Sequence, residues 1–505
     1  MSPLPPKWKL ARLNQLGRWI GGGTPSKANP GFWVTEGIPW VSPKDMKKLY
    51  LDDAEDHITK KAVEQSSTNV VAEGSVLVVT RSGILSHTLP VAKALRPLAI
   101  NQDMKALIPD KEVSSDYVLH ALRAMEPRIL QECGKSGTTV ANLDTDRFLN
   151  FQIPLPPLEI QRRLVAQLEG LFARSKSARE ELTRVPRLIE RYKQAILAAA
   201  FRGEMTREWR SNNPNLSARP EITRIENERR ELFLGSDGDA DAYSPPNRHP
   251  AVDLFKVPDT WLWLRAEAVC DFITKGTTPP AAAMTSHIGD VPYIKVYNLT
   301  FDASLNFEID PTFISNDTHN NELQRSKVYP DDVLINIVGP PLGKVSLVPD
   351  LWPEWNINQA IAVFRSVPTV NRRFLAFWFL SEQVLNWAVS RSKATAGQSN
   401  LTLQICRDMP IPVCSVDEQQ QIVQGIESAF TAIDRVAREA GRATELLDRL
   451  DHATLAKAFR GELVSPTKSR PDDVDTASNR GQRTTVVRNT IPTPRAKRSR
   501  TALTS

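Results

Sequence analysis

Small groups of lysine, glycine and aromatic residues are the features of this 505-residue chain that could do chemistry, namely phosphate or base binding. Residues 21–27 read Gly-Gly-Gly-Thr-Pro-Ser-Lys, a segment whose backbone amides could approach a phosphate while Lys27 adds charge. A flexible turn without a ligand is an equally good interpretation. The candidate phosphate or base contacts are Ser26, Lys27, Lys44, Lys47, Arg81, Lys135, Lys275, Thr277, Lys295, Tyr297, Asn298 and Lys344.

Two Asn-Gln dipeptides are a further candidate for base reading. An amide side chain offers the paired donor and acceptor that an adenine edge requires. However, Asn101-Gln102 and Asn358-Gln359 occur at matched positions in the two halves of the chain. Readers of two different sequences are not expected to share such residues, so we favour a structural role for both dipeptides.

The patterns typical of catalysis are missing. The sequence has no G-x-x-x-x-G-K-[ST] loop, no G-x-G-x-x-G turn after a strand and no H-E-x-x-H. The seven histidines are scattered, and the four cysteines form no close pair that could hold a metal. Acidic doublets such as Asp52-Asp53 and Asp331-Asp332 are typical of solvated turns. We therefore predict no catalytic, cofactor-binding or metal-binding residue in this chain.

The elements that must position the candidate contacts occur in two copies, because the chain contains an internal sequence repeat. Ile153-Pro154-Leu155 recurs 258 positions later at Ile411, and Phe201-Arg202-Gly203-Glu204 recurs at the same spacing from Phe459. Upstream the repeat drifts, because Trp8 matches Trp261 and Asn101 matches Asn358 at slightly shorter spacings. Each repeat thus has a variable half followed by a half of fixed length, as a spacer requires.

The fixed halves, residues 156–204 and 413–463, are predicted to be long helices. Apolar residues recur in alternating steps of four and three with charges between them, which is the pattern of a coiled-coil seam. Each helix would be about 65 Å long, and Pro186 should kink the first one. Burial of each stripe in its own domain is the alternative. The predicted seam or partner-docking residues are Leu164, Leu168, Leu182, Ile189, Tyr192, Ile196, Phe201, Ile422, Ile426, Ile433, Val436, Leu447, Leu450 and Phe459.

The variable halves, residues 1–155 and 256–412, are predicted to be α+β domains. β-branched runs at 76–79 and 333–337 indicate strands, and amphipathic stretches at 117–131 and 373–390 indicate helices. Antiparallel pairing of the two long helices would place the domains at opposite ends, related by a pseudo-twofold axis. Residues 205–255 form a polar, turn-rich connector between the first long helix and the second domain.

The net charge of +6 is concentrated at the C-terminus. From Lys468 onward the chain has nine basic and three acidic residues, so the part before the tail is neutral overall. The tail, residues 464–505, lacks apolar periodicity and is predicted to be disordered, either as a solubilising segment or as a phosphate-binding arm. No apolar run resembles a membrane span or a signal peptide, so we expect a cytoplasmic protein.

Five segments, taken together and in this order, resemble one protein family. The resemblance that they carry covers residues 1 to about 463, and the segments are duplicated in part. The segments are Gly22 to Lys27, Gly37 to Met46, Ile100 to Asp103, Ile153 to Pro157 with Gln161, and Ala200 to Glu204 with Trp209-Arg210. In these features the chain resembles the specificity subunits of type I restriction-modification systems. The basic tail has no counterpart in that resemblance.

The resemblance implies a non-catalytic subunit with two target recognition domains, each reading one half of a split, asymmetric DNA sequence. Two antiparallel helices would hold the domains apart and dock two modification subunits, which bind S-adenosylmethionine and methylate adenine. Restriction subunits that use ATP and Mg would join for cleavage. Two other classes compete with this interpretation: a self-sufficient DNA methyltransferase or nuclease, and a coiled-coil assembly protein without a DNA role.

Overall fold

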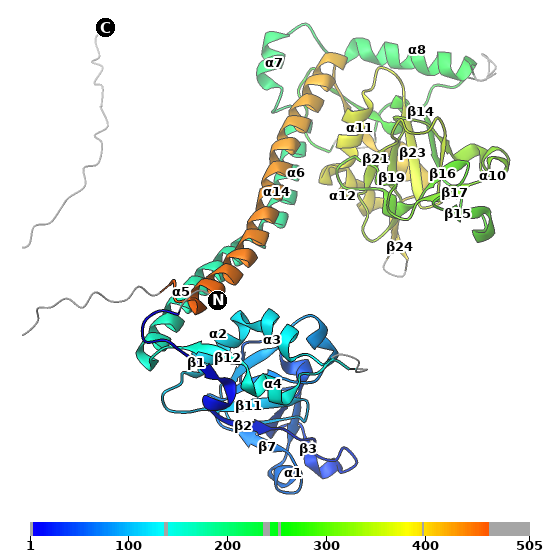
Figure 1. The fold of residues 1–505 in the computed structure, drawn as a ribbon. Helices are drawn as coiled ribbons and strands as arrows, with labels where there is room; N and C mark the ends of the chain where they lie inside the picture. The colour runs from blue at the N-terminus through cyan, green and yellow to red at the C-terminus, as the bar shows by residue number, and fades with distance from the viewer. Residues whose placement is uncertain (1–3, 136–139, 236–242, 251–253, 396–397, 464–505) are drawn as a thin grey trace, which may run out of the picture. The chain divides into compact units, whose positions relative to one another are not determined.

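The computed structural model describes residues 4–135, 140–235, 243–250, 254–395 and 398–463. The chain forms two compact units, one of residues 1–166 with 455–505 and one of residues 167–454 (Figure 1). Each unit contains one domain of mixed strands and helices. The first domain runs from Lys9 to Leu155 and the second from Leu262 to Val413. The predicted tail, residues 464–505, lies outside the described residues.

The first domain consists of two five-stranded sheets closed by a two-stranded pair, in the orders β3-β6-β4-β10-β7, β2-β11-β8-β9-β5 and β1-β12. Its first and last strands pair antiparallel, which brings the start of the domain beside the start of the long helix. The strands are β1 (Lys9–Arg12), β2 (Gly17–Gly21), β3 (Trp33–Val34), β4 (Ile38–Val41), β5 (Tyr50–Leu51), β6 (Asp56–Ile58), β7 (Asn69–Val71), β8 (Val76–Val79), β9 (Val91–Ala94), β10 (Leu98–Ile100), β11 (Met104–Pro109) and β12 (Gln152–Leu155).

The helices of the first domain are α1 (Lys60–Glu64), α2 (Ser115–Ala124), α3 (Glu126–Cys133) and α4 (Thr145–Asn150). The predicted strand at 76–79 is confirmed, and all four of its residues are buried. The helical prediction at 117–131 is correct in type, but the prediction of one continuous helix is wrong. It is two helices, because α2 ends at the C-cap residue Met125 and Pro127 stands in the first turn of α3, where a missing N–H costs nothing.

The second domain repeats most of this topology, with sheet orders β15-β17-β16-β22-β18, β14-β23-β19-β21 and β13-β26. Its second sheet has no strand that corresponds to β5, and it adds the small sheet β20-β25-β24. The strands are β13 (Leu262–Arg265), β14 (Cys270–Lys275), β15 (Met284–Ser286), β16 (Val291–Ile294), β17 (Thr312–Ile314), β18 (Lys327–Val328), β19 (Val333–Asn336), β20 (Val338–Gly339), β21 (Val345–Leu347), β22 (Trp355–Ile357), β23 (Ile361–Ser366), β24 (Lys393–Thr395), β25 (Gln398–Asn400) and β26 (Pro410–Val413). The helices are α9 (Ala266–Val269), α10 (Asn316–Asn320), α11 (Arg372–Phe379), α12 (Glu382–Arg391) and α13 (Leu403–Asp408).

Three long helices follow the two domains: α5 (Leu158–Leu182) and α6 (Val185–Phe201) after the first, and α14 (Val416–Phe459) after the second. The break between α5 and α6 confirms the kink predicted at Pro186. Within the unit of residues 167–454, Lys193 is 2.8 Å from Asp434 and Arg179 is 2.9 Å from Asp448. Because the numbers rise along one helix while they fall along the other, the helices pair antiparallel (Figure 1).

The structure buries part of the predicted seam or docking residues, and two of them, Ile422 and Ile426, lie in the hydrophobic core of the second domain. Buried or half-buried are Leu164, Leu168, Leu182, Ile189, Ile196, Ile422, Ile426, Ile433 and Leu447. The prediction of a buried seam position is wrong for Tyr192, Val436 and Leu450, whose side chains are 63%, 57% and 54% exposed. Two helices alone can cover only one narrow stripe of each other, and the break at Pro186 changes the phase of the stripe along the first helix.

The connector is more ordered than predicted. It contains α7 (Arg207–Asn212) and α8 (Arg219–Gly235), and α8 packs against the second domain. Ile225 of α8 is buried in the core of that domain, and the Glu228 carboxylate accepts hydrogen bonds from the Thr369 N–H and hydroxyl at 2.9 and 2.7 Å. The prediction of a turn-rich connector is therefore wrong for α7 and α8, whereas residues 244 and 245 are exposed as expected.

Candidate nucleic-acid interface

In the first domain, the glycine loop after β2 lies against the turn between β10 and β11. The Gly23 N–H donates to the Ile100 carbonyl at 3.0 Å, and the Trp40 indole N–H donates to the Gly23 carbonyl at 3.0 Å. A Cβ atom on Gly22 would clash with the carbonyl oxygens of Ile100 and Asn101. This close approach of two backbones requires glycine whether or not a ligand binds.

The second domain contains the same arrangement. The Thr277 N–H donates to the Ile357 carbonyl at 3.2 Å, and the Tyr293 hydroxyl donates to the Thr277 carbonyl at 2.8 Å. A Cβ atom on Gly276 would clash with the carbonyl oxygens of Ile357 and Asn358. An aromatic donor therefore holds the loop in both domains, which gives the recurrence of this segment a structural reason.

The asparagines of the two Asn-Gln dipeptides cap their own turns. The Asn101 side-chain oxygen accepts from the Asp103 N–H at 3.1 Å, and that of Asn358 accepts from the Ala360 N–H at 3.2 Å. These contacts account for the presence of both asparagines in both repeats. Beyond the turns, Ser26 and Lys27 of the first loop and Lys275 of the second are exposed, whereas Thr277 is half-buried.

The basic cluster beside β4 is only partly free. The Lys44 ammonium lies 2.9 Å from the Asp56 carboxylate and 3.2 Å from that of Glu55. The hydrogen bond to Asp56 holds the pKa of Lys44 above its usual value. In the described residues Lys47 is exposed and forms no ion pair. Lys47 is therefore better placed than Lys44 to meet a phosphate.

The matching segment of the second domain contains a correction. The Asn298 side chain, 1% exposed, donates to the Asn306 and Ile309 carbonyls at 3.1 and 2.8 Å and accepts from the Lys295 N–H at 2.9 Å. The predicted base contact by Asn298 is therefore wrong, because its amide is used up within the fold. The neighbouring Tyr297 hydroxyl donates to the Asp310 carboxylate at 2.7 Å and keeps an exposed ring.

The remaining candidates lie apart from these loops. Arg81 is exposed just after β8, and Lys135 is exposed with its ammonium 3.8 Å from the Asp144 carboxylate. Lys344 is half-buried, and its ammonium donates to the Val296 carbonyl at 3.1 Å. The structure thus brings Ser26 with Lys27, and Lys295 with Tyr297, into common loops, but it does not gather all the candidates at one site.

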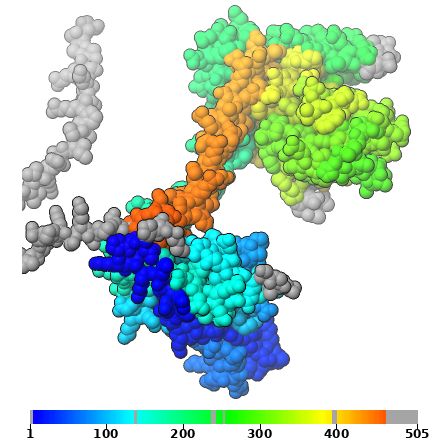
Figure 2. Space-filling model, in the orientation of Figure 1, coloured from blue at the N-terminus to red at the C-terminus, as the bar shows by residue number. Residues whose placement is uncertain are grey.

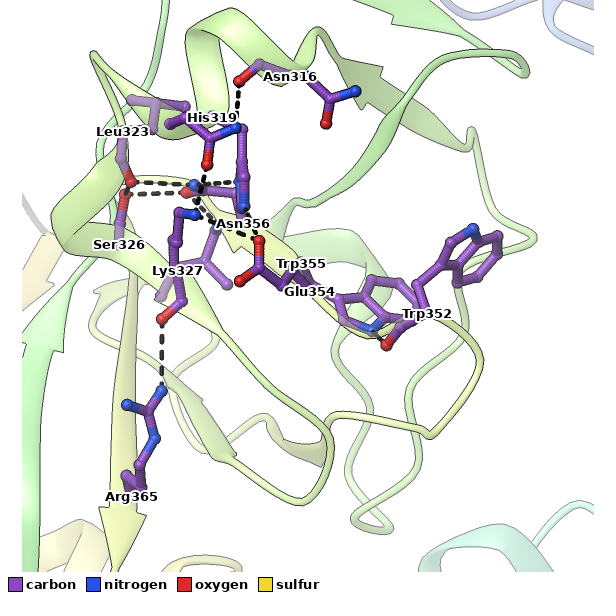
Figure 3. A network of polar contacts seen from close by, with 12 residues as sticks. Asn316, His319, Leu323, Ser326, Lys327, Trp352, Glu354, Trp355, Asn356 and Arg365 are labelled. Atoms are coloured by element: carbon purple, nitrogen blue, oxygen red, sulfur yellow. Dashed lines mark hydrogen bonds and ion pairs between the residues drawn. The ribbon is translucent and has the colours of Figure 1, made fainter.

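One polar network distinguishes the second domain from the first (Figure 3). The buried His319 ring lies 2.9 Å from the Glu354 carboxylate through Nε2 and 3.1 Å from the Asn356 amide nitrogen through Nδ1. Because the amide nitrogen donates, Nδ1 accepts and Nε2 carries the proton. Lys327 lies 3.2 Å from the same carboxylate, and the Ser326 hydroxyl donates to the Asn356 oxygen at 2.8 Å. Burial is the main cause that lowers the pKa of His319.

At the position of Asn356 the first domain has Ala99. Each of these residues pairs in parallel with an aromatic residue of the neighbouring strand, Ala99 with Trp40 and Asn356 with Tyr293. Around Ala99 the core is apolar. Sequence reasoning missed the network because its members are scattered along the chain from α10 to β22. The exchange of Ala for Asn at matched repeat positions was the available signal.

A second buried polar cluster ties the connector to the second domain. The Glu418 carboxylate, at the start of α14, accepts from the Thr206 hydroxyl at 2.7 Å, from the Arg210 guanidinium at 2.6 Å and from the Trp261 indole at 2.9 Å. Its side chain is almost fully buried. α7, α14 and the segment that enters the second domain are therefore held at one point.

The ends of the long helices pack on the domains in a crossed manner. Phe201, at the end of α6, lies 5.0 Å from Trp378 and 5.2 Å from Phe374 of the second domain, measured between ring centroids. Phe459, at the end of α14, lies 5.2 Å from Tyr117 of the first domain. The helix of each repeat therefore ends on the domain of the other repeat.

The repeated Phe-Arg-Gly-Glu segments are helix terminators. In the first copy Gly203 has φ +70, its N–H donates to the Ala200 carbonyl, and the Glu204 N–H donates to the Ala199 carbonyl. This is a Schellman motif, which needs a residue that tolerates positive φ. Gly461 has φ +76 and ends α14 in the same way.

The family comparison fits this duplicated architecture. The model described as the type I restriction modification DNA specificity domain matches residues 5–186 and again residues 258–439. The chain belongs to this family. It is a specificity subunit, a non-catalytic component that gives a type I restriction enzyme its DNA sequence specificity.

Individual relatives support the assignment. The specificity subunit of EcoR124I/EcoR124II from Escherichia coli is 41% identical over 178 residues, which are 35% of this chain and 44% of that protein. The EcoKI specificity subunit of Escherichia coli strain K12 is 22% identical over 486 residues, 94% of this chain and 93% of that protein. A solved structure described as the basis of complex assembly and conformational transition of the type I R-M system has a TM-score of 0.58 at 19% identity, with 92% of this chain and 100% of that chain covered.

Metal-binding and membrane-spanning features are absent from the described ranges. No group of three or more His, Cys, Asp or Glu side chains there is arranged to hold a metal ion. Among the helices with described residues, none has both the length and the apolar character needed to cross a membrane. The four cysteines are buried and unbridged.

Proposed function

We propose that this specificity subunit reads a bipartite, asymmetric DNA target, one half with each domain. The observation that carries the proposal is the crossed packing of Phe201 and Phe459. Each domain is followed in the chain by one long helix and is contacted by the end of the other, through Phe459 in the first domain and Phe201 in the second. The two domains share most of their topology but differ at matched surface positions, as Lys44 and Tyr297 illustrate. A common scaffold with different surface chemistry suits two readers of different half-sites.

The long helices would serve as a spacer between the readers. Two readers that enter the major groove from one side of the DNA must stand about one helical turn apart, or a multiple of it. A pair of helices of equal, fixed length meets that requirement. Exposed lysines such as Lys27 and Lys47 would position the first domain through phosphates, and base edges would be read from the loops.

Two exposed apolar pairs on the long helices support the docking of two modification subunits. Leu188 and Tyr192 are 44% and 63% exposed, and Leu446 and Leu450 are 60% and 54% exposed. The pairs occupy matched positions 258 residues apart, each with spacing i, i+4 on one helix face. Equivalent apolar surfaces suit two copies of one partner. Figure 2 shows the middle of α14, drawn in orange, as open surface on this side.

The chemistry would belong to the partners. The modification subunits would bind S-adenosylmethionine and methylate an adenine turned out of the duplex. Restriction subunits that bind ATP and Mg would join the complex for cleavage. This chain would contribute only the position of those subunits on the DNA.

A methylation map tests the reading of a split target. DNA from cells that express the modification subunit with and without this chain would be sequenced by a method that detects N6-methyladenine. The expected result is methylation at one split, asymmetric motif that disappears when this chain is deleted. Methylation that does not depend on the chain would overturn the proposal.

The docking surfaces can be tested by purification. Tyr192→Asp and Leu450→Asp should each lower the number of modification subunits that copurify from two to one, and the double variant should retain none. Leu351→Asp is the matched control, since Leu351 is an exposed leucine of the second domain. Unchanged stoichiometry in the double variant would show that the partner binds elsewhere.

A further inference from the structure

The turn that follows β16 presents an aromatic side chain to solvent. Tyr297 stands in the 3-10 turn Val296–Asn298, and its side chain is 37% exposed. Its hydroxyl donates to the Asp310 carboxylate at 2.7 Å and lies 3.3 Å from the Asp310 carbonyl oxygen. The polar end of Tyr297 is thus tied back to the protein, and the accessible part is the apolar ring.

The backbone that carries this ring is held by two polar side chains. The Asn298 side chain accepts from the Lys295 N–H at 2.9 Å and donates to two backbone carbonyls farther along the chain. The Lys344 ammonium donates to the Val296 carbonyl at 3.1 Å. A side chain that is already fixed in place loses little conformational entropy on binding. Tyr297 is therefore well suited to contribute binding energy.

The first domain contains the same turn with different chemistry. Asp45 caps it by accepting from the Ser42 N–H at 2.9 Å, the distance of the corresponding hydrogen bond in the second domain. At the position of Tyr297 stands Lys44, whose ammonium lies 2.9 Å from the Asp56 carboxylate. The turn recurs as a scaffold, whereas the side chain that it presents changes from a cation to an aromatic ring. A matched, exposed position that varies in this way suits two readers of different sequences.

The turn lies at the edge of the second domain that also carries the glycine loop. β16 and β22 run parallel and end at this edge, where the Thr277 N–H donates to the carbonyl of Ile357, the last residue of β22, at 3.2 Å. The loop with the exposed Lys275 is therefore beside the turn. The Lys295 ammonium lies 5.6 Å from the centroid of the Tyr297 ring. Positive charge around an apolar ring suits a surface that meets DNA.

The accessible part of Tyr297 limits what it can recognise. Because Asp310 engages the hydroxyl proton, the exposed ring offers C–H groups and no hydrogen-bond donor. In the major groove, the apolar group that distinguishes one base pair from another is the thymine methyl group. We propose that Tyr297 contacts the methyl group of one thymine in the half-site read by the second domain and thereby selects that base pair. This inference rests on the proposed function, because it presupposes that the second domain reads bases.

The test replaces thymine by deoxyuridine, which keeps the hydrogen-bonding groups of the base but lacks the methyl group. The complete methyltransferase complex is titrated with the native target and with duplexes in which one thymine of the second half-site, on either strand, is replaced. All titrations use one salt concentration. The proteins are wild type, Tyr297→Ala, Tyr297→Phe and a control variant.

The matched control is Tyr329→Ala. Tyr329 is a tyrosine of the same domain with nearly the same exposure, 38%. It follows Val328, which pairs with Trp355 at the opposite end of β22 from the turn. The measured quantity is the ratio of the affinities of one protein for the two duplexes, so a partly unfolded preparation does not alter it.

Wild type and Tyr329→Ala should bind the duplex with deoxyuridine at one position about fourfold more weakly than the native duplex, the factor that corresponds to burial of one methyl group. Tyr297→Ala should bind both duplexes equally. Tyr297→Phe should retain most of the difference, because it keeps the ring.

Three outcomes would overturn the methyl contact: a wild type that is insensitive to every replacement, a Tyr297→Ala variant with the wild-type ratio, and a Tyr297→Phe variant that has lost the difference. The last would show that the hydroxyl group, and not the ring, reads the base. A wild type that binds the native target no better than unrelated DNA would instead contradict the proposed function.

Discussion

The ring of Phe459, at the end of the second repeat, lies 5.2 Å from the ring of Tyr117 in the first domain. Both side chains are almost completely buried, and the Tyr117 hydroxyl donates to the Pro154 carbonyl at 2.6 Å. The last helix of the chain thereby completes the core of the first domain. Its counterpart Phe201 does the same for the second domain through Trp378. The hydrophobic core of each domain therefore includes a phenylalanine from the other repeat.

The crossed packing predicts that a defect in one repeat destabilises the other domain. Phe459→Ala should cost about 3–5 kcal/mol, as for other buried phenylalanines, and should loosen the first domain. Phe201→Ala should loosen the second domain by a similar amount. Hydrogen exchange of the intact chain distinguishes the two, because each variant should speed exchange mainly in the opposite repeat's domain.

The control for this pair is Tyr192→Ala, which removes an exposed ring and should change the unfolding free energy by no more than about 0.5 kcal/mol. Faster exchange in the second domain of the Phe459→Ala variant, with the first domain unaffected, would contradict the crossed arrangement.

The candidate DNA contacts predict different effects of two substitutions. Lys47→Ala removes an exposed charge without an ion-pair partner in the described part of the chain, so it should weaken DNA binding at any sequence and reduce the slope of log affinity against log salt by about one. Asn298→Ala removes buried hydrogen bonds and should instead lower the melting temperature. Titration of the complex with DNA at several salt concentrations measures the first effect, and calorimetry measures the second.

Lys44→Ala is the matched control, since the Lys44 ammonium is already neutralised by Asp56. A loss of salt dependence as large as that of Lys47→Ala would show that the ion pair opens when DNA binds. An Asn298→Ala protein with native stability and altered sequence preference would restore Asn298 as a base contact.

The sequence predicts the duplicated architecture because repeats and heptads are properties of residue order alone. The spacing of Leu164, Leu168, Ile422 and Ile426 requires a buried helical stripe, and Pro186 must interrupt a helix. The crossed packing of Phe201 and Phe459 is not contained in that pattern. It depends on which surface each helix end meets, and residues far apart in the chain supply those surfaces.

Other features escaped prediction because their signals are short or diluted. Ala218, Ile222 and Ile225 follow helical spacing toward the second domain, but the polar residues of α8 hide this pattern. His319 and Asn356 meet only through tertiary folding. Asn298 looked like a base reader because residue type alone does not reveal that its amide is consumed by backbone groups.

The buried Glu418 cluster predicts strong coupling between connector and domain. In Glu418→Gln the Arg210 guanidinium would remain largely buried without a countercharge, so the variant should lose on the order of 3 kcal/mol of unfolding free energy. Arg210→Met in the same background should restore part of that loss, since no unpaired charge then remains. Denaturant unfolding of the four proteins of this cycle measures the coupling. Additive losses would show that the two side chains act independently.

The first domain should lose stability in acid through His120. This side chain of α2 is buried, and burial lowers its pKa from 6.5 to about 4, with a smaller contribution from the Arg123 charge. Between those values the unfolded chain binds a proton that the folded domain excludes, so stability falls as the pH decreases from about 6.5 to about 4. The full effect of this one group is about 3 kcal/mol.

His120→Leu removes the titrating group and is expected to flatten that part of the pH dependence. The measurement is the unfolding free energy of both proteins at pH 7, 5.5 and 4.5, followed through hydrogen exchange of α2 peptides in the intact chain. The wild type should lose stability relative to the variant at each step down in pH, because only the wild type must exclude a proton from the α2 site. Curves that stay parallel from pH 7 to 4.5 would mean that His120 takes up its proton equally well in the folded domain, and its burial would then carry no electrostatic cost.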